Sequence, residues 1–520
     1  MRAETGEGVD LVVRASGLGV LLASERAGRA VIAVVTRRAL LEAPDLQVWG
    51  VVGAVVLSDS TLGSGLAAAQ RDSSRHRMNR PSVLSRDLNL PYTQVCAYTG
   101  RSAVATVVEG RGLEKVTRPV SAGVWQLWRQ TRSARRSLVE RLQEAVESVE
   151  DRALLEAAVV SRAALEEGDG VAENGWVAVL HADGNGIGDI FANLRRAYGG
   201  DELLYRLSGV SDALESAAWA AVAQAILTVA RRPASGAGWV LPILVGGDDI
   251  TVLLDARHGF AFTTALVTVL ERLLDQELVT STLARVRQLQ AETAGAVTAP
   301  QRVSVAAGLV FTKPHHPFSH SVSLAEELAR SAKSVKRFEV GAVDVLVLHE
   351  SAVRDLAAVR ADLHTTGHDD QARLRLWAGP IVLGDPPPEL AHRSVARLTE
   401  AIGLLASSAG PLARPDSVSG LAANAGAVAS ELVASGVVHE LRQVLASALP
   451  DRSRLASVVE RARVIAAERG YGPALDRLLE HLIVEDAEGP FSRLLTAMEL
   501  VDVTSGTEAA ADAAAGGVSS

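Results

Sequence analysis

The sequence contains very little cysteine, because Cys96 is the one cysteine among 520 residues. A single thiol excludes disulfides within the chain and any zinc site built from several cysteines. Lysine is almost as scarce, with four positions, and the aromatic residues together make up 4% of the chain. The lack of disulfides suits a reducing compartment, so we expect a cytoplasmic protein.

Long apolar runs are also missing from the sequence. The first ten residues lack the apolar stretch of a signal peptide, and runs such as Val48–Leu57 are too short to cross a bilayer. We therefore expect no membrane segment. The net charge of −9 argues against an extensive nucleic-acid interface, which needs a basic face.

What the chain does contain is enough apolar material for a large core. Its residues are 48% hydrophobic and 22% charged, and its length suits about three domains. We expect a mixed domain at 1–170, an alternating domain at 171–350, a helical domain at 351–504 and a disordered tail at 505–520.

In the first domain we expect strands at Val9–Ala15 and Ala30–Thr36, which are apolar and β-branched. Thr61–Asp87 is rich in Ser and Arg, which favours a loop or a mobile insertion. Val124–Glu167 has helical periodicity, with a break expected near Ser133.

The middle domain alternates between strand and helix patterns. Strands are expected at Gly175–His181, Trp239–Val245, Ile250–Leu254, Val303–Phe311 and Val343–Leu348, and helices at Asp189–Ala197, Ser211–Arg231, Phe260–Leu278 and Ser321–Lys336. Residues 288–300 are expected to connect two of these elements. The core of this order is βαββαβ, so we expect an α+β fold with a ferredoxin-like sheet and its helices on one face.

The first chemical signal directly follows a predicted strand. The run His181-Ala-Asp-Gly-Asn-Gly-Ile-Gly-Asp189 offers the Asp183 carboxylate and three glycines whose backbone amides can approach a phosphate. The helix that follows would aim its positive end at the same place. A plain glycine-rich turn or a calcium-loop lookalike explains the same residues.

The second signal is Gly246-Gly247-Asp248-Asp249, between two apolar strands. Adjacent carboxylates repel each other unless a cation offsets them, and magnesium prefers such hard oxygen ligands. An ordinary β-turn is the alternative explanation, since glycine and aspartate are common turn residues.

The third signal is the helix over residues 324–337, which ends in a basic cluster with Lys333 and Lys336. Two of the four lysines in the chain lie here, which suggests a contact with phosphate. A solvated helix end is the alternative, because cations there suit the helix dipole.

A ferredoxin-like order brings the first strand and the central hairpin side by side. Asp183 and the Asp248–Asp249 pair would then meet at one end of the sheet. Such an arrangement suits two divalent ions that activate a 3′-hydroxyl and offset the charge of a triphosphate.

The segments HADGNGIGDIF, LVGGDDITVLLDARHGFA and AAGLVFTKPHHPFSHSVSLAEELARSAK resemble the second palm domain of the large polymerase-cyclase subunit of type III CRISPR effector complexes. Diguanylate cyclases, the GGDEF domains, are more distant relatives of that palm. The resemblance covers about residues 175–350.

The resemblance implies synthesis of a cyclic nucleotide or cyclic oligonucleotide messenger from ATP, with two Mg²⁺ or Mn²⁺ ions, in antiviral defence. By the same resemblance, Asp183 and Asp249 would bind metal and Asp248 would assist. Lys333, with Lys336 as a weaker candidate, would hold the terminal phosphates. The remaining nucleotide contacts would come from Gly184, Asn185, Gly186, Gly246 and Gly247.

The sequence departs from that family in its N-terminal part. His76 stands alone and His368-Asp369-Asp370 lies in the wrong region, so we expect no histidine-aspartate nuclease domain. The chain therefore resembles a stand-alone or divergent member, with residues 1–170 interpreted as a degenerate first palm. A homodimer or a CRISPR-like complex is the expected assembly.

Two other functions remain open from the sequence. The domain could be an inactive palm that binds a nucleotide or RNA as a sensor or scaffold, or it could be a diguanylate-cyclase-like enzyme. His315 and His316 could line the nucleotide pocket or lie in a proline-stiffened surface loop, and Trp125 and Trp128 are interpreted as core anchors.

Overall fold

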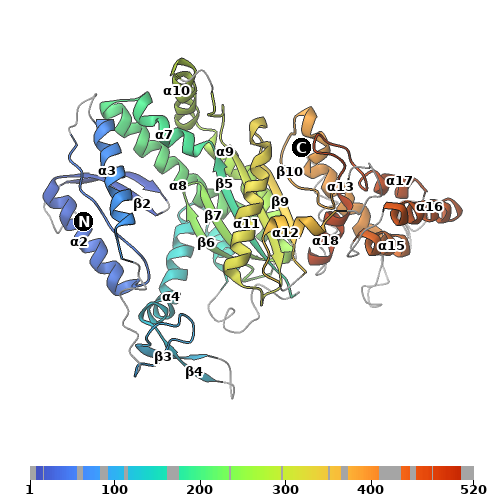
Figure 1. The fold of residues 1–520 in the computed structure, drawn as a ribbon, viewed down its shortest axis with the longest axis horizontal. Helices are drawn as coiled ribbons and strands as arrows, with labels where there is room; N and C mark the ends of the chain where they lie inside the picture. Colours follow the sequence, from blue (N-terminus) through green and yellow to red (C-terminus); the bar gives the residue numbers. More distant parts are fainter. Residues whose placement is uncertain are drawn as a thin grey trace.

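The computed structural model describes residues 8–15, 17–55, 62–81, 92–109, 115–160, 175–232, 236–293, 297–349, 352–364, 373–408, 435–445, 452–470 and 472–504. The chain is a mixed α+β protein, with a central sheet between N-terminal elements and a group of C-terminal helices (Figure 1). The expected tail at 505–520 and the His368-Asp369-Asp370 run lie outside the described residues.

The central sheet has six strands in the order β10-β9-β8-β5-β7-β6. These strands are β5 (Val177–Asn185), β6 (Val240–Gly246), β7 (Asp249–Asp255), β8 (Ser304–Thr312), β9 (Ala342–Val347) and β10 (Ile381–Val382). The strand order β8-β5-β7-β6, with antiparallel pairing of β5 to β7 and β8, is that of a βαββαβ ferredoxin-like unit. The strands β9 and β10 widen this unit on the side of β8.

The helices of the central part are α7 (Ile187–Ala197), α8 (Gly200–Ala230), α9 (Ala256–Leu274), α10 (Glu277–Thr293) and α11 (Phe318–Ala332). The helices α8 and α9 of the βαββαβ core share one face of the sheet, as expected for that core, whereas α11, which follows the core, covers the other face. Leu180 packs into the core that includes α8 and α9, whereas its neighbour Val179 packs with Leu324 and Leu328 of α11. Successive side chains of a strand point to opposite faces, and α11 therefore lies opposite α9 (Figure 1).

Gly308 of β8 explains how closely α11 approaches the sheet. A Cβ atom at this position would overlap the carbonyl oxygen of Ala325 and lie 2.5 Å from the nitrogen of Ala329. Because glycine has no Cβ, the helix backbone can rest on the strand there.

Helix boundaries in this part differ from the expected ones in three places. The helix expected at Ser211–Arg231 is α8, which already begins at Gly200. The helix expected at Phe260–Leu278 is two helices, because α9 ends at Leu274 and α10 begins at Glu277. The helix α10 continues to Thr293, through part of the connector expected at 288–300. The helix expected at Ser321–Lys336 ends at Ala332, and a 3-10 helix, η3 (Lys333–Phe338), follows.

The N-terminal elements are β1 (Val9–Ala15), β2 (Leu18–Ala23), α2 (Glu25–Glu42), α3 (Leu62–Met78), β3 (Ala105–Glu109), β4 (Val116–Val120), α4 (Ala122–Gln143) and α5 (Val149–Ala158). They include two separate antiparallel hairpins, β1-β2 and β3-β4. The strand expected at Val9–Ala15 is present as β1. Trp125 and Trp128 are partly buried against the small core of Cys96, Val107 and Val120.

Three expectations for this region are wrong. Ala30–Thr36 is helical within α2, because Ser24 caps that helix through the Ala27 amide and the cap overrides the β-branched run. The expected loop at Thr61–Asp87 contains α3, whose last turn carries the basic residues that suit a helix C-terminus. The break in Val124–Glu167 comes after Gln143 rather than near Ser133.

The C-terminal elements are α12 (Leu356–Asp362), η4 (Pro388–Arg393), α13 (Val395–Ser408), α15 (Ser435–Leu445), α16 (Arg452–Arg469), α17 (Gly472–Leu479) and α18 (Leu494–Thr504). This region is mainly helical, as expected, but it also supplies β10. Since β10 pairs with β9, the region beyond residue 350 is joined to the central sheet.

The helix α8 is long and apolar enough to cross a membrane by length and composition, which the sequence search for apolar runs did not detect. In the structure, 56% of its most apolar window is buried inside the protein. It packs against α9, β1 and α5, which is typical of a core helix.

Candidate active site at one end of the central sheet

A single row of backbone pairs crosses all six strands of the sheet at one end. Asp249 of β7 pairs with Gly246 of β6 and with Asp183 of β5, and Asp183 also pairs with Ala306 of β8. The row continues through Ala342 of β9 to Val382 of β10. We call this end of the sheet, where Asp183 and Asp249 lie, the acidic end.

Asp183 and Asp249 are direct partners across an antiparallel ladder, so their side chains leave the same face of the sheet. That face is the one covered by α11, because Asp183 follows Val179 at an even spacing. Like charges placed opposite each other on a sheet are destabilising unless another group offsets them. The structure thus brings together two of the three acids that the sequence proposed as metal ligands.

The third acid, Asp248, lies in the turn between β6 and β7. Gly247 has a φ of 65°, the left-handed conformation that lets a glycine start this tight turn. The Cβ of Asp248 lies 3.2 Å from where a Cβ at Gly184 would stand, so Asp248 is beside β5 as well. All three acids therefore belong to one local cluster.

Burial and mutual repulsion disfavour the charged form of two of these acids. Burial raises the pKa of the Asp248 carboxyl, and the charges of Asp183 and Asp249 raise it further. Burial also raises the pKa of Asp249, with added repulsion from Asp183 and Glu326, while His181 acts in the opposite direction. Perturbed carboxyl groups of this kind cluster at functional sites.

Lys333 supplies a positive charge to the cluster. Its Nζ forms an ion pair with Oδ2 of Asp183, and both side chains are about one-third exposed. Lys333 is the first residue of η3, where the chain leaves α11 above the sheet. Lys336 is exposed and lies further along η3. The proposed phosphate-binding lysine therefore reaches the acids themselves.

His181 and Thr251 complete the polar surface next to the acids, and the sequence reasoning did not assign a role to either. His181 Nδ1 lies 3.2 Å from Thr251 Oγ1 and 3.5 Å from Asp249 Oδ1. His181 stands two residues before Asp183 on a strand, so the alternation of side chains could have placed it on the same face.

The expected glycine-rich loop after β5 is mostly strand. Gly184 and Asn185 pair with β8, both are buried, and the Asn185 amide donates to Ser304 Oγ at 3.1 Å. Gly186 has a φ of 91° and begins α7, with Pro300 where its Cβ would be. These residues shape the turn into α7, and their role in nucleotide binding stays a prediction.

The chemistry of the acids fits a divalent cation that prefers oxygen ligands. Oδ1 of Asp249 is buried and accepts no hydrogen bond. In the part of the chain that the structure describes, no three His, Cys, Asp or Glu side chains are arranged to hold a metal ion by themselves. Magnesium is usually held by one or two carboxylates together with phosphate oxygens of the substrate, so the two facing aspartates suit it with a bound nucleotide.

His315 and His316 do not lie near the acids. They follow β8, whose last residue Thr312 pairs with Val177 at the start of β5, whereas Asp183 is near the end of β5. The six residues between Val177 and Asp183 separate the two positions by about 20 Å at the rise of a strand. The interpretation that these histidines could line the nucleotide pocket is wrong.

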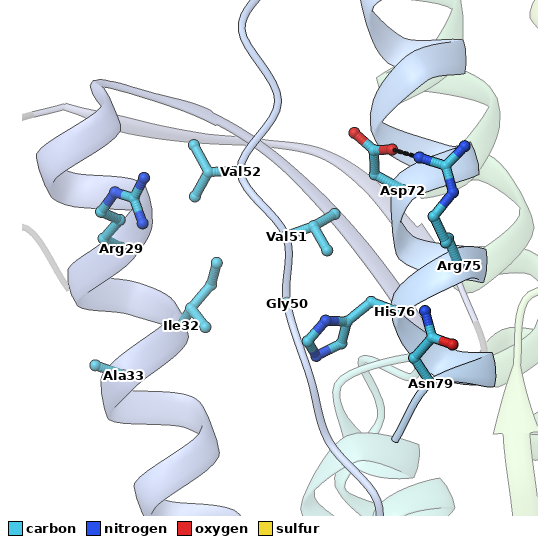
Figure 2. Close-up of a pocket in the computed structure, with 10 residues that line it drawn as sticks. All are labelled: Arg29, Ile32, Ala33, Gly50, Val51, Val52, Asp72, Arg75, His76 and Asn79. Carbon is cyan, nitrogen blue, oxygen red and sulfur yellow. Dashed lines mark hydrogen bonds and ion pairs between the residues drawn. The ribbon is translucent and has the colours of Figure 1, made fainter.

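A cavity of about 620 Å³ lies away from the acids, between α2 and α3 (Figure 2). His76 lines it together with Asp72 and Arg75 of α3 and Arg29 of α2. Asp72 accepts a hydrogen bond from Arg75 at 3.2 Å, so the acid in this lining is already paired. The cavity lacks the facing carboxylates of the central sheet.

Comparisons with known proteins add little to this description. No known protein family and no curated protein sequence match the chain. Among solved structures, the chain is similar to the diguanylate cyclase SiaD in complex with its activator SiaC from Pseudomonas aeruginosa, at 16% identity and a TM-score of 0.17. The match covers 43% of this chain and 68% of the other. That TM-score is too low to carry an argument about function.

Proposed function

We propose that the acidic end of the sheet binds a nucleoside triphosphate with two Mg²⁺ or Mn²⁺ ions and catalyses nucleotidyl transfer. The observation that carries the proposal is the direct pairing of Asp183 with Asp249 across two neighbouring strands at one end of the sheet. The product would be a cyclic nucleotide or cyclic oligonucleotide made from ATP, as the resemblance to the CRISPR-type palm implies.

In this proposal Asp183 and Asp249 hold the divalent ions, and Asp248 stabilises them from the turn. When bound, the ions lower the pKa of the attacking hydroxyl and offset the charge of the phosphates. Lys333 leaves Asp183 and binds the terminal phosphates, with Lys336 as a second cation. The buried Gly246 and Gly247 keep side-chain atoms away from the space beside the turn.

The reaction forms one bond and breaks another at the same phosphorus. The 3′-hydroxyl oxygen attacks the α-phosphorus, its proton passes to solvent, and the bond to the β-phosphate oxygen breaks to release pyrophosphate. The carboxylates hold the reacting groups in line, and Lys333 neutralises charge on the leaving pyrophosphate.

Incubation of the purified chain with ATP labelled on the α-phosphate, in Mg²⁺ or Mn²⁺, tests the proposal. We expect release of pyrophosphate and a labelled cyclic product, both abolished by Asp248→Ala combined with Asp249→Ala. Asp72→Ala, in the N-terminal cavity, serves as the matched control and should retain activity. Equal pyrophosphate release by the double variant would disprove the assignment of the site.

A second candidate function is an inactive palm that senses a nucleotide. The ion pair between Lys333 and Asp183 favours it, because the lysine occupies a carboxylate that catalysis needs for metal. A sensor would bind ATP tightly and release no pyrophosphate with either ion. Lys333→Met separates the two functions, since it should weaken nucleotide binding in both but should change a reaction rate only in the enzyme.

The pathway is a further part of the proposal. We place the enzyme in antiviral signalling in the cytoplasm, as a stand-alone protein, a homodimer or a subunit of a CRISPR-like complex. Its support is the resemblance of residues 175–350 to the CRISPR-type palm. The mass of the purified protein in solution, with and without ATP, distinguishes a monomer from a dimer.

A further inference from the structure

A second cavity adjoins the acidic end of the sheet. It has a volume of about 470 Å³ and lies between the end of α11, the 3-10 helix η3 and the segment around Trp377 to Pro380 that leads into β10. The positively charged residues that line it are Arg330, Lys333, Lys336, Arg360 and Arg375. Among the described residues lining the cavity, Glu488 is the one acid. We call this cavity the basic pocket.

Some of these cations already have counterions. Arg360 pairs with the buried Asp344 at 2.6 Å, and Arg375 pairs with Asp486 and with Glu488, both at 2.7 Å. These pairs hold the two guanidinium groups at the wall of the pocket.

Arg330 and Lys336 differ from the two fixed arginines. Both are exposed, and within the described ranges neither takes part in an ion pair. Lys333 also lines the pocket, but its Nζ already has a counterion in Asp183. A cation that replaced Lys333 at Asp183 would leave three uncompensated charges on one side of the pocket.

The contacts of Trp377 indicate whether the pocket suits the base or the phosphates of a nucleotide. The guanidinium of Arg360 lies 4.9 Å from the centre of its ring and that of Arg375 lies 5.9 Å away. His364 packs against the same ring with its edge, at 5.0 Å. The tryptophan therefore supports the arginines through cation–π contacts, and its ring is not offered for stacking on a base.

We propose that the basic pocket binds the phosphate chain of a nucleotide, and that the region beyond residue 350 thereby completes the site through Arg360 and Arg375. The identity of the ligand rests on the proposed function, while the binding itself requires neither metal nor turnover. Lys333 connects the pocket to Asp183, so the phosphate chain extends away from the acids toward Trp377.

A short polyphosphate fits the pocket better than a nucleic acid does. The volume of the pocket, about 470 Å³, is in the size range of small-ligand sites. A nucleic-acid strand needs a basic track along several nucleotides, whereas the whole chain carries a net charge of −9.

The test measures binding of inorganic tripolyphosphate to the full chain by calorimetry, in EDTA and at low salt. We expect saturable binding that Arg330→Ala weakens about fivefold, as the loss of one exposed charge contact implies. Glu488→Gln should tighten binding about threefold, because it removes the acid that competes for Arg375. Asp486 still holds Arg375 in that variant.

Two matched controls remove the same charges nearby. Arg337→Ala changes an exposed arginine of η3 that stacks on Phe338 and does not line the pocket, and Glu485→Gln changes an exposed acid close to Glu488. Both should leave the affinity unchanged. Circular dichroism and thermal unfolding check that each variant is folded.

Several outcomes would overturn the inference. These are absence of saturable binding, equal effects of Arg330→Ala and Arg337→Ala, or tighter binding of a single-stranded oligonucleotide than of tripolyphosphate with the same dependence on Arg330. If tripolyphosphate binds as expected while ATP gives no pyrophosphate, the inference stands and the proposed function fails.

Discussion

The two ends of the central sheet differ in how their charged side chains are paired. At the end formed by Val177 and Thr312, the buried Asp255 is paired with Arg257 at 2.9 Å, and Lys313 lies 3.7 Å from the centre of the Trp176 ring. At the acidic end, three aspartates cluster and Lys333 is the cation that pairs with one of them.

This difference separates structural charges from functional ones. Asp255 caps α9 and pairs with an arginine, so its charge is satisfied within the fold. The acidic end retains carboxyl groups whose pKa values are raised by burial and repulsion, a cost that a bound cation would relieve. The comparison therefore supports the proposal that the acidic end binds a ligand, whereas the charges of the other end stabilise the fold.

The largest expected effect concerns turnover. Asp183→Asn should lower the rate of pyrophosphate release about 10³-fold, because it removes charge that stabilises the transition state. Lys313→Ala and His316→Ala, at the other end of β8, should leave the rate unchanged. A rate loss in the Lys313 or His316 variant comparable to that of Asp183→Asn would break the comparison.

Among the variants that test the fold, Gly308→Ala should have the largest effect. Gly308 lies midway along β8, between the two ends of the sheet, and the backbone of α11 packs directly on it. The added methyl group would overlap the Ala325 carbonyl, and the resulting strain should lower the free energy of unfolding by about 3 kcal/mol. Urea unfolding measures this change.

Gly403→Ala is the matched control for that variant. Gly403 lies in α13, and within the described part of the chain no neighbouring atom would lie within 4 Å of an added Cβ. The substitution should therefore raise stability by about 0.5–1 kcal/mol through helix propensity. Equal stability of the two variants would show that α11 does not rest on β8 as described.

The sequence predicted the acidic end well because strand alternation and hairpin pairing are local rules. Asp183 directly follows an apolar run, and the hairpin turn fixes the position of Asp249 on the neighbouring strand. The same rules could have found His181. They could not find Arg360 or Arg375, which come from a region whose pairing with β9 has no local sequence signal.

The position of α11 was not predictable for a different reason. The strand β8 runs parallel to its neighbour β9 and also to β7, which lies on the other side of β5. The connections from β7 to β8 and from β8 to β9 cross the sheet in the same direction, so the usual right-handed rule would put α9 and α11 on one face. The structure puts them on opposite faces, and the two crossovers therefore have opposite hands. Gly308 permits the close approach of α11, but a glycine in a strand does not by itself predict which face of the sheet a helix covers.

The smallest expected effect concerns Glu271 of α9, a half-buried acid next to the acidic end of the sheet. Burial raises the pKa of its carboxyl to about 7, although the Val305 amide donates to it at 3.0 Å. Because the folded-state pKa lies above the ordinary value of 4.5, ionisation costs stability. That cost is absent below about pH 4.5, grows as the pH rises, and is complete above about pH 7.

Glu271→Gln should remove this pH dependence while keeping an oxygen that accepts from Val305. At pH 8 the variant should be more stable than the original chain by about 2 kcal/mol, and at pH 4.5 the two should be equal, as urea unfolding at both pH values can measure. Asp255→Asn, at the opposite end, should destabilise at pH 8, since it breaks the pair with Arg257. A stabilising effect at both ends, or at neither, would mean that the two ends do not differ in how their acids are balanced, and the acidic end would then lose its distinction as a binding site.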